Sequence, residues 1–190
     1  MKERNRHITM RVQNINDLYY DAMDALSIGD YHSAENMLLK AKEIDPHCVQ
    51  TYVGLASVYG RPEDKKKAVG NIKIAFEKVL KRFPKWPKRM GWGDMDNRAY
   101  MRAIQYRADI YNDKGEKNKV IKLYKFLLKL NPNDNQGVRY VLAGLCAGIS
   151  GQEINIMFDE GNEKQNWSTL EKLVETQNSK YKFWKKPKLY

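Results

Sequence analysis

Long apolar runs are missing from this 190-residue sequence. A membrane-spanning helix needs about 18 or more consecutive, mostly apolar residues, and no stretch of the chain reaches that length. The N-terminal segment MKERNRHI is basic but lacks the apolar stretch of a secretory signal. We therefore expect a cytoplasmic protein that has no membrane partner.

Cysteine and histidine are scarce. The two cysteines, Cys48 and Cys146, are too few for a disulfide scaffold in a chain of this length, and we expect both to be buried thiols. The three histidines, His7, His32 and His47, do not show the spacing of zinc ligands. No metal site is therefore expected.

The common catalytic and cofactor-binding motifs are also missing. The sequence contains no glycine-rich phosphate loop followed by Lys and Ser or Thr, no G-x-G-x-x-G, no G-x-S-x-G and no H-E-x-x-H. Helical hairpins with solvated carboxylates lack the paired, shielded acids that acid–base chemistry requires. We expect a protein that is not an enzyme and that binds no cofactor.

Positive charge is concentrated in one part of the chain. The formal net charge is +11, and residues 61–130 carry 20 Lys and Arg against 8 Asp and Glu. Residues 1–60 have a balance of −2 and residues 131–190 a balance of +1. A field of this kind attracts acidic partners or nucleic acid, although it does not determine the fold.

A degenerate repeat organises most of the sequence. Residues 29–46 recur in weakened form as residues 115–132, and these segments end in Asp-Pro and Asn-Pro. Units of about 34 residues, counted from the two prolines, start at Ile15, Val49, Met101 and Asn135. In the first three units the eighth position is alanine and the fourth is bulky. This pattern is typical of packed helix pairs, because two helices cross closely only where a small side chain faces a large one. The alanines are Ala22, Ala56 and Ala108, and the bulky residues are Leu18, Tyr52 and Ile104.

At these residues the chain resembles the tetratricopeptide repeat family. The resemblance implies an all-α fold, a right-handed solenoid of antiparallel helical hairpins that binds other proteins. The second unit departs from the pattern, because it holds about 18 extra residues and an insertion near residues 83–95. We expect an N-terminal arm at residues 1–14, repeats at residues 15–165, and a capping helix with a basic tail at residues 166–190.

Turn and capping signals predict where the helices lie. A capping box of Ser168 and Glu171 is expected to start the last helix, and residues 185–190 are expected to fray. The first helix should start near residue 14 or 16. The others should span about 31–44, 47–59, 63–82, 97–112, 116–130, 133–146, 152–160 and 168–181.

The family resemblance also implies a binding surface. In such a solenoid the first helix of each hairpin lines a concave groove, through the second, fifth, ninth and twelfth positions of its unit. The second half of the groove should offer guanidinium and amide groups, with Arg102 and Arg139 placed to hold a carboxylate. The groove residues that we single out are Tyr19, Met23, Val53, Ser57, Arg102, Gln105, Asp109 and Arg139.

The insertion is a second candidate surface, in which cations alternate with aromatic rings. Its residues are Lys85, Trp86, Lys88, Arg89 and Trp92. Indole rings beside cations can stack on bases or accept an acidic peptide. Tryptophans in an irregular loop also anchor the loop onto the helices, because burial of a ring offsets the entropy of ordering the loop. The sequence leaves both interpretations open.

The sequence therefore predicts a non-catalytic scaffold that binds a protein or peptide, preferably an acidic one, in the concave groove. The alternative is a nucleic-acid-associated protein that uses the basic segment 61–130 and its aromatic insertion. The two hypotheses differ in salt dependence, because phosphate contacts release counterions and make affinity fall steeply with salt.

Overall fold

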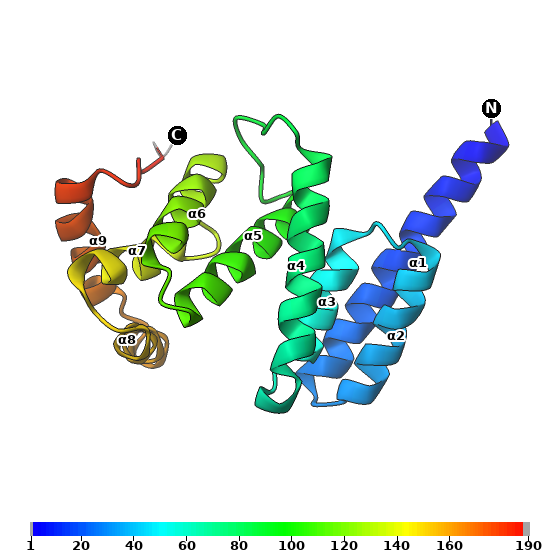
Figure 1. Cartoon of the computed structure of the whole chain (residues 1–190), viewed down its shortest axis with the longest axis horizontal. Coiled ribbons are helices and arrows are strands. Elements are labelled where there is room, and N and C mark those ends of the chain that lie inside the picture. The colour runs from blue at the N-terminus through cyan, green and yellow to red at the C-terminus, as the bar shows by residue number, and fades with distance from the viewer. Residues whose placement is uncertain (1, 188–190) are drawn as a thin grey trace. The chain divides into compact units, whose positions relative to one another are not determined.

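The computed structural model describes the backbone of residues 2–187 and the side chains of residues 15–187. Over these residues the chain is all-helical and contains no strand. Figure 1 shows the helices, most of which pack against the next helix along the chain. They are α1 (Lys2–Ser27), α2 (Tyr31–Ile44), α3 (Val49–Val58), the 3₁₀ helix η1 (Pro62–Asp64), α4 (Lys65–Arg82), α5 (Met95–Asp113), α6 (Lys117–Leu130), α7 (Val138–Ala147), α8 (Gly151–Lys164) and α9 (Ser168–Tyr181).

The chain forms two compact units. The first comprises the residues up to 85 together with residues 98–103, and the second comprises residues 86–97 and those from 104 onward. Helices α1 to α4 build the first unit, helices α6 to α9 build the second, and α5 contributes residues to both. The irregular second repeat is thus the part of the sequence where the chain passes from one unit to the other.

Small residues let the helices of the first unit pack closely. Gly29, with φ +82°, makes the turn between α1 and α2, and Ala22 and Ala34 are fully buried between these two helices. A Cβ atom at Gly54 of α3 would lie 2.9 Å from the Leu38 side chain of α2. Glycine at this position therefore allows α3 to approach the first hairpin.

The second unit is built around α7, which packs against α6, α8 and α9. A Cβ atom at Gly144 of α7 would lie 2.5 Å from the Ile154 side chain, so only glycine fits where α8 meets α7. Leu127, Leu142 and Leu170 come from three different helices and are at most 2% exposed. The unit therefore has a core of its own.

The repeat positions are mostly buried. Ala22, Ala56 and Ala108, which occupy the eighth position, are 0%, 6% and 0% exposed. At the fourth position Tyr52 and Ile104 are buried, whereas Leu18 is half-buried. The arrangement of the hairpins as a solenoid and the resemblance to the tetratricopeptide family stay predictions.

Several helix boundaries differ from those expected. Helix α1 begins at Lys2, so it runs through the expected arm at residues 1–14, whose side chains lie outside the described residues. Helix α7 begins at Val138, because Gly137 adopts φ +70° and interrupts the helical path that was expected from residue 133. Helices α2 and α9 have the expected bounds.

The capping box lies on α8 and not on α9. The Ser150 hydroxyl accepts a hydrogen bond from Glu153 N (3.2 Å), and the Glu153 carboxylate accepts one from Ser150 N (2.8 Å). At the start of α9, the carboxylate of Glu171 instead accepts a hydrogen bond from Arg139 (2.8 Å). The expected box at Ser168 is therefore wrong, because its glutamate makes a tertiary contact.

Ala108 provides a stability test of the register. Its side chain is 0% exposed. We expect Ala108→Leu to lower the free energy of unfolding by about 1–3 kcal/mol in urea denaturation, because overpacking forces neighbouring side chains off their rotamers. The control is Ala147→Leu at the exposed end of α7, which should change this free energy by less than about 0.5 kcal/mol. Equal effects of the two substitutions would contradict the register.

Candidate functional site

The loop at residues 83–94 is fastened to the C-terminal end of α6. The Trp86 ring packs edge-to-face on Phe126, with 4.7 Å between ring centroids. Met90 is buried, and its N–H donates to Leu130 O (2.8 Å). The Arg89 guanidinium donates to the carbonyl of the preceding residue of α6. These bonds satisfy carbonyls that the end of a helix leaves without partners, so the loop is held beside α6.

The C-terminal tail folds back onto the same unit. Asn178 of α9 clamps Trp184, because its side chain accepts from Trp184 N and donates to Trp184 O (both 2.8 Å). Phe183 is buried, and Trp184 Nε1 donates to Pro132 O (2.9 Å). These contacts hold the tail as far as Trp184. Lys185 and Lys186 are exposed and residues 188–190 lie outside the described residues, so the expected fraying of residues 185–190 stays a prediction.

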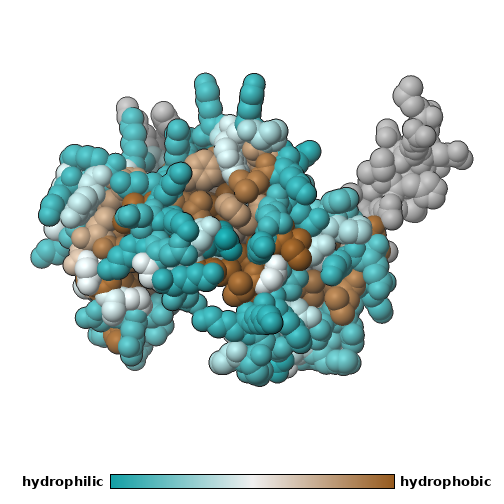
Figure 2. Space-filling view, in the orientation of Figure 1, coloured by the Kyte–Doolittle hydropathy of each residue, from teal (hydrophilic) through white to brown (hydrophobic). Residues whose placement is uncertain are grey.

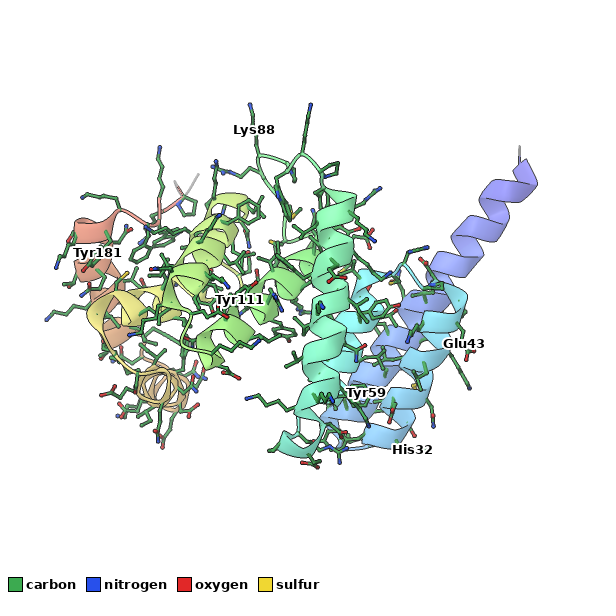
Figure 3. All side chains as sticks on the ribbon, in the orientation of Figure 1. His32, Glu43, Tyr59, Lys88, Tyr111 and Tyr181 are labelled. Atoms are coloured by element: carbon green, nitrogen blue, oxygen red, sulfur yellow. The ribbon has the colours of Figure 1, made fainter. Side chains whose placement is uncertain are left out.

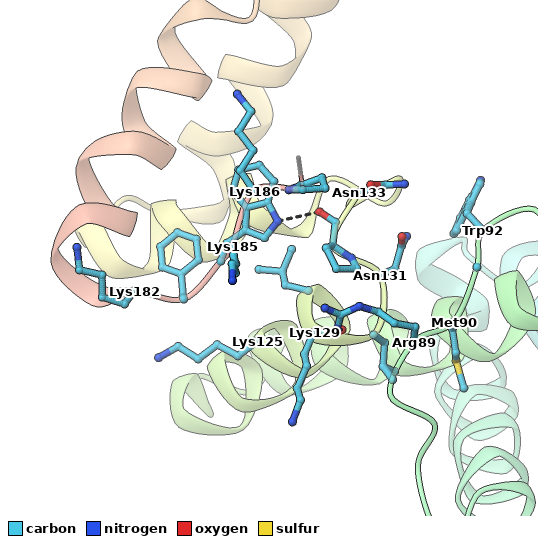
Figure 4. A pocket seen from close by; sticks show the side chains of 17 residues that line it. Arg89, Met90, Trp92, Lys125, Lys129, Asn131, Asn133, Lys182, Lys185 and Lys186 are labelled. Atoms are coloured by element: carbon cyan, nitrogen blue, oxygen red, sulfur yellow. Dashed lines mark hydrogen bonds between the residues drawn. The ribbon is translucent and has the colours of Figure 1, made fainter. Parts of the chain in front are cut away.

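The loop, the end of α6 and the tail enclose a cavity of about 1060 Å³, which we call the basic pocket. Figure 4 shows the tail on one side of it and the loop of Arg89 and Trp92 on the other. No residue that lines it is acidic. Its cations are Arg89, Lys125, Lys129, Lys182, Lys185 and Lys186.

Apolar side chains form much of the wall of the basic pocket. Met90, Leu128, Leu130 and Phe183 are buried and make its deep part. The half-buried side chains nearer to solvent are Trp92, Pro132, Trp184 and Pro187. The pocket thus combines an apolar interior with a cationic rim.

The positive charge of the basic pocket is not neutralised by ion pairing within the described side chains. The salt bridges that join these side chains lie elsewhere in the two units. Burial opposes the lowered pKa of Glu171, which results from hydrogen bonds from Tyr140 and Arg139 with a smaller contribution from Lys186. Burial raises the pKa of the Cys146 thiol, and Lys125 opposes that rise. The rim is therefore able to attract an anionic partner.

The structure separates the predicted insertion residues into three roles. Arg89 and Trp92 line the basic pocket. Trp86 anchors the loop on α6, as one of the two interpretations predicts. Lys85 and Lys88 are exposed, and Figure 3 shows Lys88 projecting from the loop away from the helices. The tail lysines were not predicted as site residues, because the tail has no helical periodicity and was expected to fray.

The predicted groove residues of the first unit are largely internal. Tyr19 and Val53 are 5% and 2% exposed, so the expectation that they line an open groove is wrong. Tyr19 packs near Gly54, where the missing side chain of glycine makes room for its ring. Met23 is half-buried against the same core, and the half-buried Ser57 donates to Val53 O (3.2 Å).

The polar groove residues also make internal hydrogen bonds. Arg102 donates to the Tyr19 hydroxyl (3.3 Å), and Gln105 accepts from Gln136 (2.6 Å). The carboxylate of Asp109 accepts from the Tyr124 hydroxyl. Burial raises the pKa of Asp109 to about 6, although the bond from Tyr124 works in the opposite direction. These groups serve the packing of their own units.

Arg139 is the centre of a partly buried ionic network, in which the Asp134 side chain is 2% exposed and that of Glu171 is 39% exposed. The carboxylate of Asp134 accepts from Arg139 N and from its guanidinium (both 3.0 Å), and the guanidinium also donates to Glu171 (2.8 Å). The central guanidinium carbon of Arg139, Cζ, lies 4.0 Å from the ring centre of Tyr140 and 5.2 Å from that of Trp184. Arg139 thus supports the tail that forms one wall of the basic pocket.

The remaining surface is mixed. Figure 2 shows hydrophilic side chains over most of the visible face, with smaller hydrophobic patches between them. Large exposed apolar residues such as Ile28, Leu80 and Ile156 come from different segments, and single residues of this kind are normal on a protein surface. The basic pocket is therefore the strongest candidate site.

Comparisons with models of known protein families and with curated proteins give no match. None of the helices that the structure describes combines the length and apolar character that a bilayer span requires. The described side chains also include no cluster of three or more His, Cys, Asp or Glu that could hold a metal ion. The function must therefore be argued from the basic pocket itself.

Proposed function

We propose that this protein is a non-catalytic helical scaffold, a solenoid of hairpins similar to tetratricopeptide repeats, that binds an acidic protein segment in the basic pocket. One observation carries the proposal: six cations and no acid line one cavity of about 1060 Å³. A concentration of one charge sign in a concave site raises the local concentration of an oppositely charged partner and speeds its association.

The chemistry of the lining supports binding rather than catalysis. The lining residues include no His, Asp, Glu, Cys, Ser or Thr. General acid–base and nucleophilic catalysis often use such groups. Lysine can also act as a base or nucleophile, but burial or a neighbouring group has to activate it, and all five lysines of the lining are exposed. Lysine and the indole ring instead supply charge and contact area.

Nucleic acid is the second candidate partner. The observation in its favour is that Trp92 and Trp184 line the same cavity as the six cations. Single-stranded nucleic acids bind to such combinations through backbone charge and through stacking of bases on aromatic rings. Such binding should weaken steeply and log-linearly as salt increases.

A charge-matched pair of variants tests the proposed function. One variant replaces Lys125, Lys129 and Lys185 of the basic pocket with alanine, and the control replaces three exposed lysines of α4, which are Lys66, Lys73 and Lys81. Fluorescence anisotropy with a labelled peptide rich in Glu and Asp should show at least about a tenfold loss of affinity for the pocket variant and less than about a twofold loss for the control.

Two outcomes would contradict the proposal. Equal losses in the two variants would show that the net charge of the whole chain attracts the peptide and that the pocket has no special role. Tighter binding of single-stranded oligonucleotides than of the acidic peptide, with a steep loss between about 50 and 200 mM salt, would favour the second candidate.

A further inference from the structure

The polar main-chain groups around the deep part of the basic pocket are already hydrogen-bonded. Leu130 O accepts from Met90 N (2.8 Å), and Pro132 O accepts from Trp184 Nε1 (2.9 Å). The Arg89 guanidinium donates a hydrogen bond to Lys129 O. An apolar group can enter beside these carbonyls without breaking their bonds, whereas a polar group that lost its bonds to water would not find these carbonyls free.

The lining residues divide into two kinds that match two parts of a ligand. Eight of the 17 are apolar and six are cationic, so apolar burial and charge attraction both contribute to binding. The volume of about 1060 Å³ lies at the upper end of the roughly 300–1,000 Å³ that is usual for ligand pockets. The cavity is therefore large enough to take a side chain together with part of its backbone.

The cations approach the cavity from three separate segments. Arg89 comes from the loop, while Lys125 and Lys129 lie one helical turn apart on α6. The tail supplies three further lysines between residues 182 and 186. Because the loop and the tail are on different sides of the cavity, acidic groups that flank a buried anchor can meet a cation in either direction.

We infer that the partner segment carries one large apolar side chain between acidic residues, and that this side chain is the anchor that enters the basic pocket. The anchor contacts Leu128 and Phe183 in the deep part and Trp92 nearer to solvent, and the flanking carboxylates face the lysines of the rim. This inference rests on the proposed function and specifies its partner.

The same geometry disfavours phosphate and nucleobases. Among the helices only α6 contributes lining residues, and it does so with its C-terminal end, where no free main-chain N–H groups gather to hold a phosphate. The lysines of the pocket and Arg89 attract carboxylates and phosphates alike, so the interior of the pocket has to discriminate between the two partners. A base would also bring polar edges into the apolar interior.

Peptide binding to the full chain tests the anchor. The probes are a labelled acidic peptide with a central leucine, the same peptide with serine at that position, and a single-stranded oligonucleotide of deoxythymidine. We expect the leucine peptide to bind at least about tenfold more tightly than the serine peptide. The leucine peptide should also keep more of its affinity at about 200 mM salt, because salt does not screen apolar contacts. Trp92→Ala should weaken binding of the leucine peptide at least about fivefold and leave the serine peptide nearly unchanged.

Each result decides a different point. Equal affinity for the two peptides would overturn the anchor while leaving the proposed function in place. Binding of neither peptide would overturn both. Tightest binding of the oligonucleotide would replace the acidic peptide with nucleic acid as the partner. If Trp92→Ala unfolds, the comparison of leucine and serine peptides on the unaltered protein still decides the question.

Discussion

Arg139→Ala is expected to lower the free energy of unfolding by about 3–5 kcal/mol, since removing one partner of a buried ion pair leaves the other charge uncompensated. Here the partner is Asp134, whose side chain is only 2% exposed. Burial already raises the pKa of Asp134, and the hydrogen bonds and the charge of Arg139 oppose that rise. The substitution also removes the cation that lies between the rings of Tyr140 and Trp184.

Urea denaturation measures this effect, and two variants control it. Lys119→Ala removes a cation whose ion pair with Glu116 is largely exposed, and should cost less than about 1 kcal/mol. Arg139→Lys keeps the positive charge but removes the planar guanidinium group, so we expect an intermediate loss of the free energy of unfolding. A loss below about 1 kcal/mol for Arg139→Ala would mean that this arginine is a solvated groove residue, as the family resemblance implies.

The network of Arg139 also links stability to the basic pocket. Trp184 stacks over Arg139 and donates to Pro132 O, and the following residues of the tail carry two of the lysines of the rim. Weakening this support removes one wall of the pocket. Binding assays on variants of Arg139 must therefore be read together with their unfolding curves.

The repeat core was predictable because its pattern is local. Two helices that cross closely need a small residue at a fixed spacing from a large one, and a single sequence displays that spacing. Ala56 and Ala108 were assigned to the interior in this way, and both are buried. The bounds of α2 followed from equally local turn signals, such as Gly29-Asp30 before it and Asp45-Pro46 after it.

The candidate site was only partly predictable, because its contacts join distant parts of the chain. Arg89 bonds to a carbonyl 40 positions away, and Trp184 bonds to one 52 positions away. No periodic pattern in the sequence connects such segments. Arg89 and Trp92 were predicted from the alternation of cations and aromatic rings in the insertion, but no sequence pattern placed the tail lysines beside them.

Local patterns also failed where tertiary contacts compete for the same group. Two serines, Ser150 and Ser168, each precede a glutamate by three residues. The pattern is identical, yet only Ser150 forms a capping box. Glu171 has a better partner in Arg139, which lies 32 positions earlier in the chain.

Asp109→Asn is expected to stabilise the protein at neutral pH. Burial raises the pKa of Asp109 to about 6, so its ionised form costs about 3 kcal/mol of folding free energy. The native state holds the proton more tightly than the unfolded state, so this contribution makes the protein less stable as pH rises from about 4 to 6. Asparagine cannot ionise and keeps an oxygen that accepts from the Tyr124 hydroxyl.

The difference between variant and parent therefore has a defined pH profile. It should be close to zero near pH 4, where the native carboxyl is protonated, and should reach about 3 kcal/mol in favour of asparagine above about pH 7. Asp159→Asn, at an exposed position of α8, controls for the loss of one negative charge and should give a flat difference. Asp113 contributes to the raised pKa of Asp109, so Asp113→Asn should shift the profile slightly toward lower pH. If the difference in the free energy of unfolding between Asp109→Asn and the parent did not depend on pH, the carboxyl of Asp109 would be solvated. It would then be an open groove residue, as the sequence predicts.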